Sequence, residues 1–245
     1  MHTKTNRFWE IDTLRGIAII MMVIYHILFD LNFLNIYSIN LHLLSFRLFL
    51  YPIGTTFLLL VGISLTLSYS KRKKQLTEKA LFYRFIMRGM KIFTLGLLIT
   101  VSTWFLIGDG FIVFGVLHLI GVSIILSYPF INEKTLSFII GITIIPLGIF
   151  LRFVVFEFNY LLWLGFIPRD FYTLDYFPLF PWFGVVLLGI GIGNHFYKNH
   201  KRQFNITNHS DQWAIKNLSY LGRHSLIIYV LHQPIILFIL IMITR

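Results

Sequence analysis

Long apolar runs, separated by short polar connections, follow one another along almost the whole chain. Runs long enough to cross a membrane lie at residues 16–34, 46–69, 83–107, 111–131, 135–156, 178–197 and 218–243. A helix of about 20 apolar residues spans the hydrocarbon core of a bilayer. The pattern therefore predicts an all-α fold, a polytopic transmembrane helix bundle of about seven helices in the lipid bilayer.

The segment between the fifth and sixth runs does not fit this pattern. Residues 157–177 are interrupted by polar residues and are rich in aromatic ones. Trp and Tyr are enriched where a membrane meets water, so we expect this segment to lie in the outer interface. A re-entrant helix there, which would be the eighth of the bundle, is the alternative. Since no linker-like stretch separates the runs, we expect one domain over residues 1–245.

The orientation follows from two strongly basic connections. The one between the second and third runs reads "KRKKQLTEK", and the one between the sixth and seventh contains "YKNHKRQFN". Lys and Arg collect in the cytoplasmic loops of membrane proteins. Both connections and the N-terminus fall on one side if the chain crosses seven times. We therefore expect a cytoplasmic N-terminus and a C-terminus on the opposite side.

The composition supports a membrane protein and excludes several kinds of site. Hydrophobic residues make up 57% and charged residues 13% of the chain, whereas about a quarter of a soluble domain is charged. The net charge of +11 follows from basic cytoplasmic loops, so it does not indicate nucleic acid binding. The absence of cysteine excludes disulfides, thiolate metal ligands and cysteine nucleophiles. We expect a multi-pass protein of the cell membrane.

Three polar residues share one face of the first predicted helix. At 100° per residue, Arg15, His26 and Asp30 project from the same side, with Arg15 about 16 Å from His26 along the axis. An arginine at the inner end of a helix is often only a topological anchor. A histidine within the hydrocarbon region is costly and by default indicates a functional site. Asp30, one turn further on, either ends the helix or orients the imidazole.

Two more histidines lie inside apolar runs. His118 in "FGVLHLIG" and His232 in "IYVLHQP" are both placed where they could meet His26 within the bundle. On the last helix, Ser225, Tyr229 and His232 are spaced by four and three residues, which gives a polar stripe. Such a stripe either bonds neighbouring helices together or contacts a substrate.

The stretch "DYFPLFPWF" begins the sixth run on the outer face. Proline near the start of a helix is ordinary. Asp175 and Trp182, which flank these prolines, combine an acid with an aromatic ring, and this combination suits a sugar or polyol at a membrane mouth. An ordinary helix start and an acceptor site are therefore both open for this stretch.

Taken in order, several segments resemble two related families of membrane enzymes. Arg15 followed by His26 on a first membrane helix, with ten residues between them, is similar to the signature of the acyltransferase 3 family. The longer pattern more closely resembles the heparan-alpha-glucosaminide N-acetyltransferase catalytic-domain family. The segments are "EIDTLRGIAIIMMVIYH", "FLLLVGISLTLS", "FGVLHLIGVS", "DYFPLFPWFGVVLLGIGIG" and "LGRHSLIIYVLHQP", which are spread over residues 10–234.

The resemblance implies transfer of an acyl group, usually acetyl, from cytosolic acyl-CoA to an acceptor on the opposite face. Acetyl-CoA would be a cosubstrate, with no permanently bound cofactor and no metal. His26 would act as a general base or as a nucleophile, and Asp30 would hold the tautomer of its imidazole.

Further residues acquire roles from the same resemblance. Basic residues on the cytoplasmic side would pair with the phosphates of coenzyme A; the candidates are Arg15, Arg84, Arg88, Lys91 and Arg223. A sugar-like acceptor would present a hydroxyl or an amine to His118, Asp175, Trp182, Ser225, Tyr229 and His232. The acyl group, the acceptor and the choice between monomer and homodimer stay open.

Two other functions would use the same polar residues. A membrane redox protein would take two of His26, His118 and His232 as axial haem ligands. A small-molecule transporter would line a path with them and would show related discontinuous helices in the two halves of the chain, a symmetry that the sequence lacks. The haem interpretation leaves Arg15 and the ordered segments unexplained. We therefore expect an acyl-CoA-dependent membrane acyltransferase.

Overall fold

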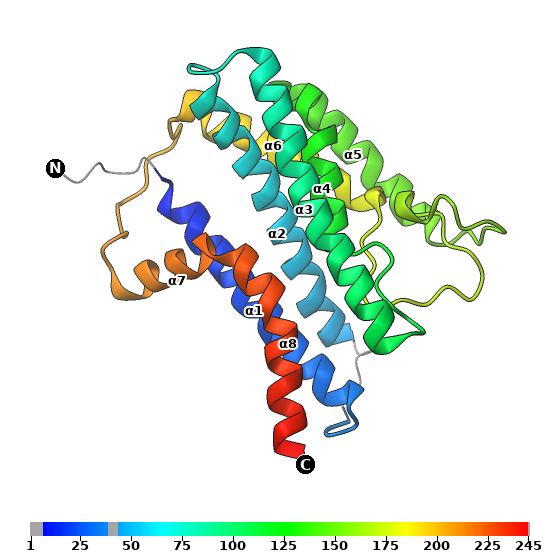
Figure 1. The fold of residues 1–245 in the computed structure, drawn as a ribbon. Helices are drawn as coiled ribbons and strands as arrows, with labels where there is room; N and C mark the ends of the chain where they lie inside the picture. Colours follow the sequence, from blue (N-terminus) through cyan, green and yellow to red (C-terminus); the bar gives the residue numbers. More distant parts are fainter. Residues whose placement is uncertain (1–6, 39–43, 245) are drawn as a thin grey trace. The chain divides into compact units, whose positions relative to one another are not determined.

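Helices make up most of the protein in the computed structural model, which describes residues 7–38 and 44–244 (Figure 1). Within these residues they are α1 (Trp9–Phe33), α2 (Leu44–Arg72), α3 (Glu78–Ile107), α4 (Val116–Leu126), α5 (Lys134–Leu151), α6 (Leu179–Phe196), α7 (Trp213–Arg223) and α8 (Ser225–Thr244). Six of these helices are long and apolar enough to cross a membrane, whereas α4 and α7 are shorter. The prediction of an all-α, polytopic membrane bundle is therefore confirmed.

The described helices fall into two compact units. The first comprises α1, the part of α2 up to Leu60, α7 and α8. The second is Val61–Asn205, with the rest of α2 and the helices α3 to α6. Some candidate residues of the sequence analysis lie in the first unit, and the others lie in the second. The expectation of one domain over residues 1–245 stays a prediction.

Local signals in the sequence account for several helix ends. Helix α1 begins earlier than residue 16 because Glu10 and Asp12 lie in its first turn, where the positive end of the helix dipole favours carboxylates. Helix α3 begins after Thr77, whose side chain accepts the N–H of Ala80 at 3.4 Å. It ends at Gly108, whose φ of +74° suits a residue without a side chain.

Small residues line the crossing of α1 and α7 in the first unit. A Cβ on Gly16 would collide with the backbone of α7, and one on Gly222 would collide with the backbone of α1. Beside these glycines, the hydroxyls of Thr13 and Ser219 are hydrogen-bonded at 2.8 Å. Close backbone approach with hydroxyl bonds across it is typical of helix packing within a membrane.

Helices α1 and α8 run in the same direction. Near its start, α1 meets the end of α7, where Arg15 donates to the carbonyl of Gly222. Further along α1, His26 faces His232 of α8, so the two helices are parallel (Figure 1). Two membrane spans that run in one direction are the first and last of an odd number of crossings. The six long helices alone would give an even number, so the shared direction of α1 and α8 favours a seventh crossing.

The short helix α4 and its flanking residues are the candidate for that crossing in the second unit. Before α4, the N–H of Ile112 donates to the hydroxyl of Thr103 near the end of α3 at 3.1 Å. After α4, the hydroxyl of Tyr128 donates to the carboxylate of Glu78 at the start of α3 at 2.9 Å. This segment therefore runs antiparallel along most of α3. The resulting seven crossings support the expected placement of the termini on opposite sides, which stays a prediction.

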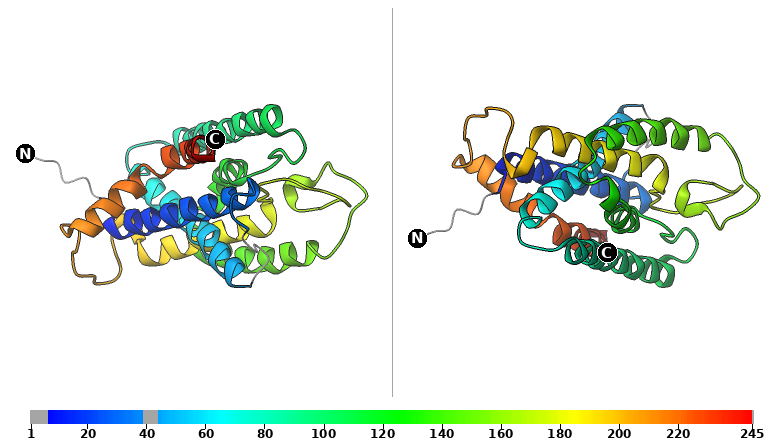
Figure 2. Two further views of the ribbon diagram at one scale, coloured as in Figure 1. Left: turned by 90° about the horizontal axis from the view of Figure 1, so that it is seen from below. Right: turned by 90° about the horizontal axis from the view of Figure 1, so that it is seen from above.

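Paired glycines set the closest helix contacts of the second unit. Helices α5 and α6 lie side by side (Figure 2). A Cβ on Gly141 of α5 would lie 2.9 Å from the carbonyl oxygen of Gly184 on α6, and the reverse distance is 2.8 Å. Gly89 and Gly121 make the same kind of contact between α3 and α4. These contacts hold the two helices of each pair close together.

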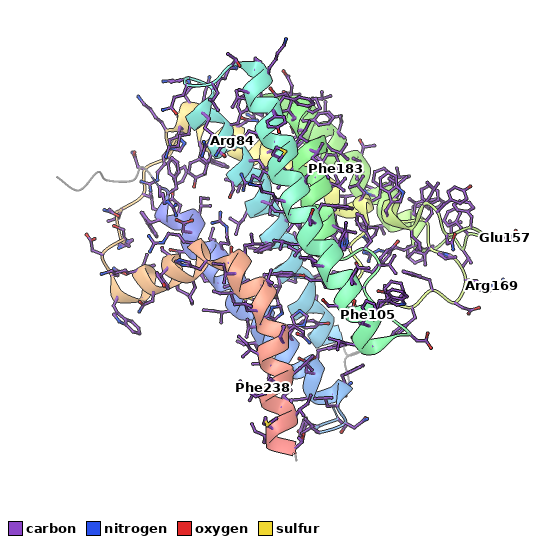
Figure 3. The ribbon with its side chains drawn as sticks, in the orientation of Figure 1. Arg84, Phe105, Glu157, Arg169, Phe183 and Phe238 are labelled. Carbon is purple, nitrogen blue, oxygen red and sulfur yellow. The ribbon has the colours of Figure 1, made fainter. Side chains whose placement is uncertain are left out.

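Residues 157–177 form no re-entrant helix, so the alternative considered for them is wrong. They contain only the 3-10 turn Leu162–Leu164 within an irregular loop, and Gly165 after it has a φ of +118°, which ends the turn. Figure 3 labels Glu157 and Arg169 towards the tip of this loop.

The prediction of one helix over residues 218–243 is also wrong in one respect, because these residues belong to two helices. The chain turns at His224 between α7 and α8. There the backbone N–H and Nδ1 of His224 both donate to the carbonyl of Tyr220, at 3.3 and 2.9 Å. These bonds cap the end of α7 and favour the turn.

Candidate functional site

His26 of α1 faces His232 of α8 in the first unit. The two imidazole rings have centroids 4.7 Å apart and planes at 62° to each other. His232 is buried, and both residues lie within helices of membrane-crossing length. The structure therefore brings together two of the three intramembrane histidines that the sequence analysis selected. Ionisable residues at such positions are costly and usually serve a function.

The tautomer of His232 is fixed by its own helix. Its Nδ1 lies 2.6 Å from the carbonyl oxygen of Tyr229, one turn earlier in α8. Because a carbonyl oxygen only accepts hydrogen bonds, Nδ1 carries the proton and donates it. Nε2 of the neutral ring then has a lone pair, and this atom is covered by protein without a hydrogen-bond partner among the described residues. Nε2 is therefore available to accept a hydrogen bond or a proton from a ligand.

Asp30 is held by Gln233. The side-chain Nε2 of Gln233 donates to both carboxylate oxygens of Asp30, at 2.8 and 3.0 Å. This differs from the expectation that Asp30 orients the imidazole of His26. The carboxylate is almost completely buried, and a buried charge needs such a donor. Gln233 was missed by the sequence analysis; its only signal was its place directly after His232 in "IYVLHQP".

Three polar atoms on α1 and α8 have no hydrogen-bond partner within the part of the chain that the structure describes. They are Nδ1 of His26, Nε2 of His232 and Oε1 of Gln233, and each is covered from solvent. Nearly all buried polar atoms in proteins are hydrogen-bonded, so three in one place indicate a ligand site. The two imidazole rings are too close to admit an iron porphyrin between them, so this pair does not fit a haem with two axial histidines.

Arg15 lies at the crossing of α1 and α7. Its Nη1 donates to Oδ1 of Asp12 at 3.0 Å and to the carbonyl oxygen of Gly222 at 3.4 Å. Gly222 is in the last turn of α7, where the negative end of the helix dipole favours a cation. Arg15 therefore links two helices, and about a fifth of its side chain (20%) remains exposed.

The other candidates of the first unit follow α7 and α8. Ser225 is buried and Tyr229 is half-buried, on the same face of α8 as His232. Arg223 is exposed at the last position of α7, with its guanidinium carbon 5.9 Å from the ring centroid of Tyr220. Stacking of this kind holds a guanidinium in place near the surface.

In the second unit, both ring nitrogens of His118 are engaged at the start of α4. Nδ1 accepts the N–H of Gly115 at 3.2 Å, and Nε2 lies 3.3 Å from Oγ1 of Thr100. Because Nδ1 accepts, Nε2 carries the proton of the neutral ring and donates to Thr100. The ring lies against Gly96, where a Cβ would be 3.0 Å from Nδ1. Through these contacts, His118 stabilises the start of α4.

Asp175 caps the same helix from a distant part of the chain. Its Oδ2 accepts the N–H of Val116 at 3.3 Å, a task that the N-cap residue Gly115 cannot perform without a side chain. Burial raises the pKa of Asp175 to about 6, although the bond from Val116 opposes the rise by stabilising the charged form. Asp175 therefore makes a structural hydrogen bond to α4 and has a pKa close to neutral pH.

The remaining candidates of the second unit lie on α6 and α3. Trp182 is buried against a phenylalanine ring 5.1 Å away, and its indole N–H has no hydrogen-bond partner among the described residues. Arg84, Arg88 and Lys91 are exposed in the first half of α3. Figure 3 labels Arg84 near one end of α3 and Phe105 near the other, so the helix is basic at one end and aromatic at the other.

Comparison with known proteins gives one match. A family model described as "Heparan-alpha-glucosaminide N-acetyltransferase, catalytic" matches residues 7–234. The matched range includes every candidate residue named above, from Arg15 to Gln233. No curated protein and no solved structure matches the chain.

Proposed function

We propose a function for this chain, which belongs to the heparan-alpha-glucosaminide N-acetyltransferase catalytic family. It transfers an acetyl group from cytosolic acetyl-CoA to a sugar-like acceptor on the outer face of the cell membrane. Membership makes the chain an acetyltransferase-type enzyme, and its six long apolar helices make it an integral membrane protein. The donor, the acceptor and the direction of transfer are the proposed part.

The observation that carries this proposal is the pair His26 and His232. Two imidazoles with unpartnered nitrogens, placed edge to face inside helices of membrane-crossing length, are suited to acyl transfer. One imidazole either attacks the acyl carbon as a nucleophile or acts as the base that activates the acceptor for this attack. The other imidazole accepts or donates a proton. Covered atoms of this kind have no structural purpose of their own, because an unpaired buried polar atom destabilises a fold.

Basic residues on the cytoplasmic side are proposed to bind acyl-CoA. Coenzyme A carries phosphate groups that pair well with guanidinium forks. Arg84, Arg88 and Lys91 are exposed on α3, and Arg223 is exposed at the end of α7, as such contacts require. Arg15 donates to Asp12 of α1 and to Gly222 of α7, and we propose that it lies at the phosphate end of the bound acyl-CoA.

Each unit carries side chains that are proposed to contact the acceptor. Trp182 offers an aromatic face and an unpartnered N–H, which are features of sugar sites. Ser225 and Tyr229 share the face of α8 that carries His232. His118 and Asp175 support the start of α4, and we propose that they shape the acceptor site through that helix.

A direct assay tests the function. Purified protein in detergent or vesicles is incubated with acetyl-CoA labelled in the acetyl group, together with a cell-envelope extract or a glucosaminide. We expect label to appear in a sugar-containing product and coenzyme A thiol to be released in equal amount. Hydrolysis of acetyl-CoA without any labelled product would contradict the proposed function.

A further inference from the structure

Helix α7 packs one face against α1 and exposes the other. Its buried residues, Ser219 and Gly222, lie at the crossing with α1. On the opposite side, Trp213 and Tyr220 are 80% and 56% exposed, and Lys216 is exposed between them. Positions 213, 216 and 220 are spaced by three and four residues, so their side chains form one stripe along the helix. Two aromatic rings and an ammonium group are therefore turned away from α1.

Two helices of membrane-crossing length fix the level at which α7 lies. A Cβ on Gly222 would meet α1 between Asp12 and Gly16, where the apolar run of α1 begins. Helix α8 begins at Ser225, directly after the turn at His224. Figure 1 shows that α7 runs across the direction of α8. A short helix that lies across the starts of two spans lies along the membrane surface, where hydrocarbon gives way to headgroups.

The exposed stripe has the composition of a helix that binds a negatively charged lipid surface. Trp and Tyr are favoured at the boundary between hydrocarbon and water, because one end of each ring system is apolar and the other polar. Residues 213–223 include two basic residues, Lys216 and Arg223, and no acidic one. Lys216 forms no ion pair within the described part of the chain. Its long apolar stem can lie along the lipids while the ammonium reaches the headgroups.

We infer that α7 binds anionic phospholipids of the leaflet that surrounds the start of α1, which is the cytoplasmic leaflet in the proposed orientation. Lys216 pairs with their headgroups, and Trp213 and Tyr220 insert between neighbouring lipids. A zwitterionic headgroup carries equal positive and negative charge, so a basic stripe favours headgroups with a net negative charge. The guanidinium of Arg223, which is also proposed to bind acyl-CoA, lies 5.9 Å from the ring centroid of Tyr220 and adds its charge to this surface. The inference does not depend on acetyl transfer.

The absence of cysteine allows a single probe to be placed on this face of the full-length protein. Asn217→Cys, at an exposed position beside the stripe, is labelled with a fluorophore, and the protein is reconstituted in phosphatidylcholine vesicles. An equal small fraction of nitroxide-labelled phosphatidylglycerol or nitroxide-labelled phosphatidylcholine is then included. The ratio of the two quenching strengths measures the enrichment of anionic lipid beside α7. We expect about fivefold enrichment, the usual contribution of one basic residue near an anionic surface.

Three variants, each made in the labelled protein, separate charge from insertion. Lys216→Gln should lower the enrichment to about twofold or less, with Arg223 left in place. Lys79→Gln removes the same charge from an exposed position in the first turn of α3 and should keep the native enrichment. Trp213→Ser should lower the quenching by both lipids by about half, because the ring no longer holds the helix among them. All three should keep the native melting temperature, since the replaced side chains are exposed.

The inference would be wrong if the two lipids quenched equally, because α7 would then show no preference for negative charge. Absence of quenching by either lipid would place the stripe in water and would also contradict it. So would an enrichment that Lys216→Gln leaves unchanged. An enrichment that acetyl-CoA abolishes would assign the stripe to the phosphates of that ligand instead of lipid. Quenching that falls as more protein is packed into each vesicle would assign it to a second copy of the chain.

Discussion

Replacing Asp175 by asparagine tests the cap on α4 and has a pH dependence with a definite sign. The pKa of this carboxyl rises from 3.8 to about 6 on folding, chiefly because of burial. The protonated form is therefore favoured in the folded state. Stability from this group is fully present below about pH 4 and is lost as the pH rises through about 6.

The magnitude follows from the size of the shift. A rise of roughly two pH units corresponds to about 3 kcal/mol between the charged and neutral forms. Asparagine is neutral at every pH and can still accept the N–H of Val116 through its amide oxygen. Near neutral pH, Asp175→Asn should therefore be more stable than the native protein by as much as about 3 kcal/mol. At about pH 4 the two proteins should be equally stable.

The assay is a series of thermal unfolding curves of the purified protein between about pH 4 and pH 7. Other titratable groups contribute equally to both proteins, so the difference between the two curves isolates Asp175. Asp170→Asn is the control, since Asp170 is exposed on the same loop with a φ of +61° that asparagine also tolerates. A difference that stays constant over this range, or that grows towards low pH, would refute the reasoning.

Three further results are expected. Gly222→Ala should lower the free energy of unfolding by about 1–3 kcal/mol, because its Cβ would collide with the carbonyl of Asp12. Asn217→Ala, at an exposed position on the same helix, is the control and should leave the free energy of unfolding unchanged. Equal melting curves for the two variants would contradict the close crossing of α1 and α7. Arg15→Lys should weaken acetyl-CoA binding by roughly tenfold in a titration, because an ammonium lacks the guanidinium fork, and an unchanged affinity would leave Arg15 as an anchor only. In this cysteine-free chain, a membrane-impermeant thiol reagent applied to intact cells should label Thr244→Cys and not Gln75→Cys. Labelling of both or neither would contradict the seven crossings.

The membrane spans were predictable because hydropathy is a local property of the sequence. Helices α2, α3, α5 and α6 match the expected runs to within about five residues at each end. Helix α4 is shorter than the run at 111–131 for a reason that lies far along the chain. Asp175 accepts the N–H of Val116, the first residue of α4, so the helix begins there and not at residue 111. No local pattern contains that information.

The candidate site was predictable in part for the same reason. Helical spacing and the cost of burying ionisable groups selected His26 and His232, and the structure places their rings edge to face. The partner of Asp30 was not predictable, because an aspartate has an equally good local option in a histidine four residues away. The structure pairs it with Gln233 at a separation of 203 residues. A contact of that range depends on how α1 and α8 pack, which a single sequence does not reveal.

The most direct test of the central claim is turnover by His26→Ala, measured beside a melting curve and an acetyl-CoA titration on the same purified variant. The account predicts that acetyl transfer is abolished while the melting temperature and the affinity for acetyl-CoA stay close to native, because His26 acts on the reacting bond. A histidine that only supports the fold would lower stability and activity together. A well-folded His26→Ala protein that still transfers acetyl groups at the native rate would contradict the account.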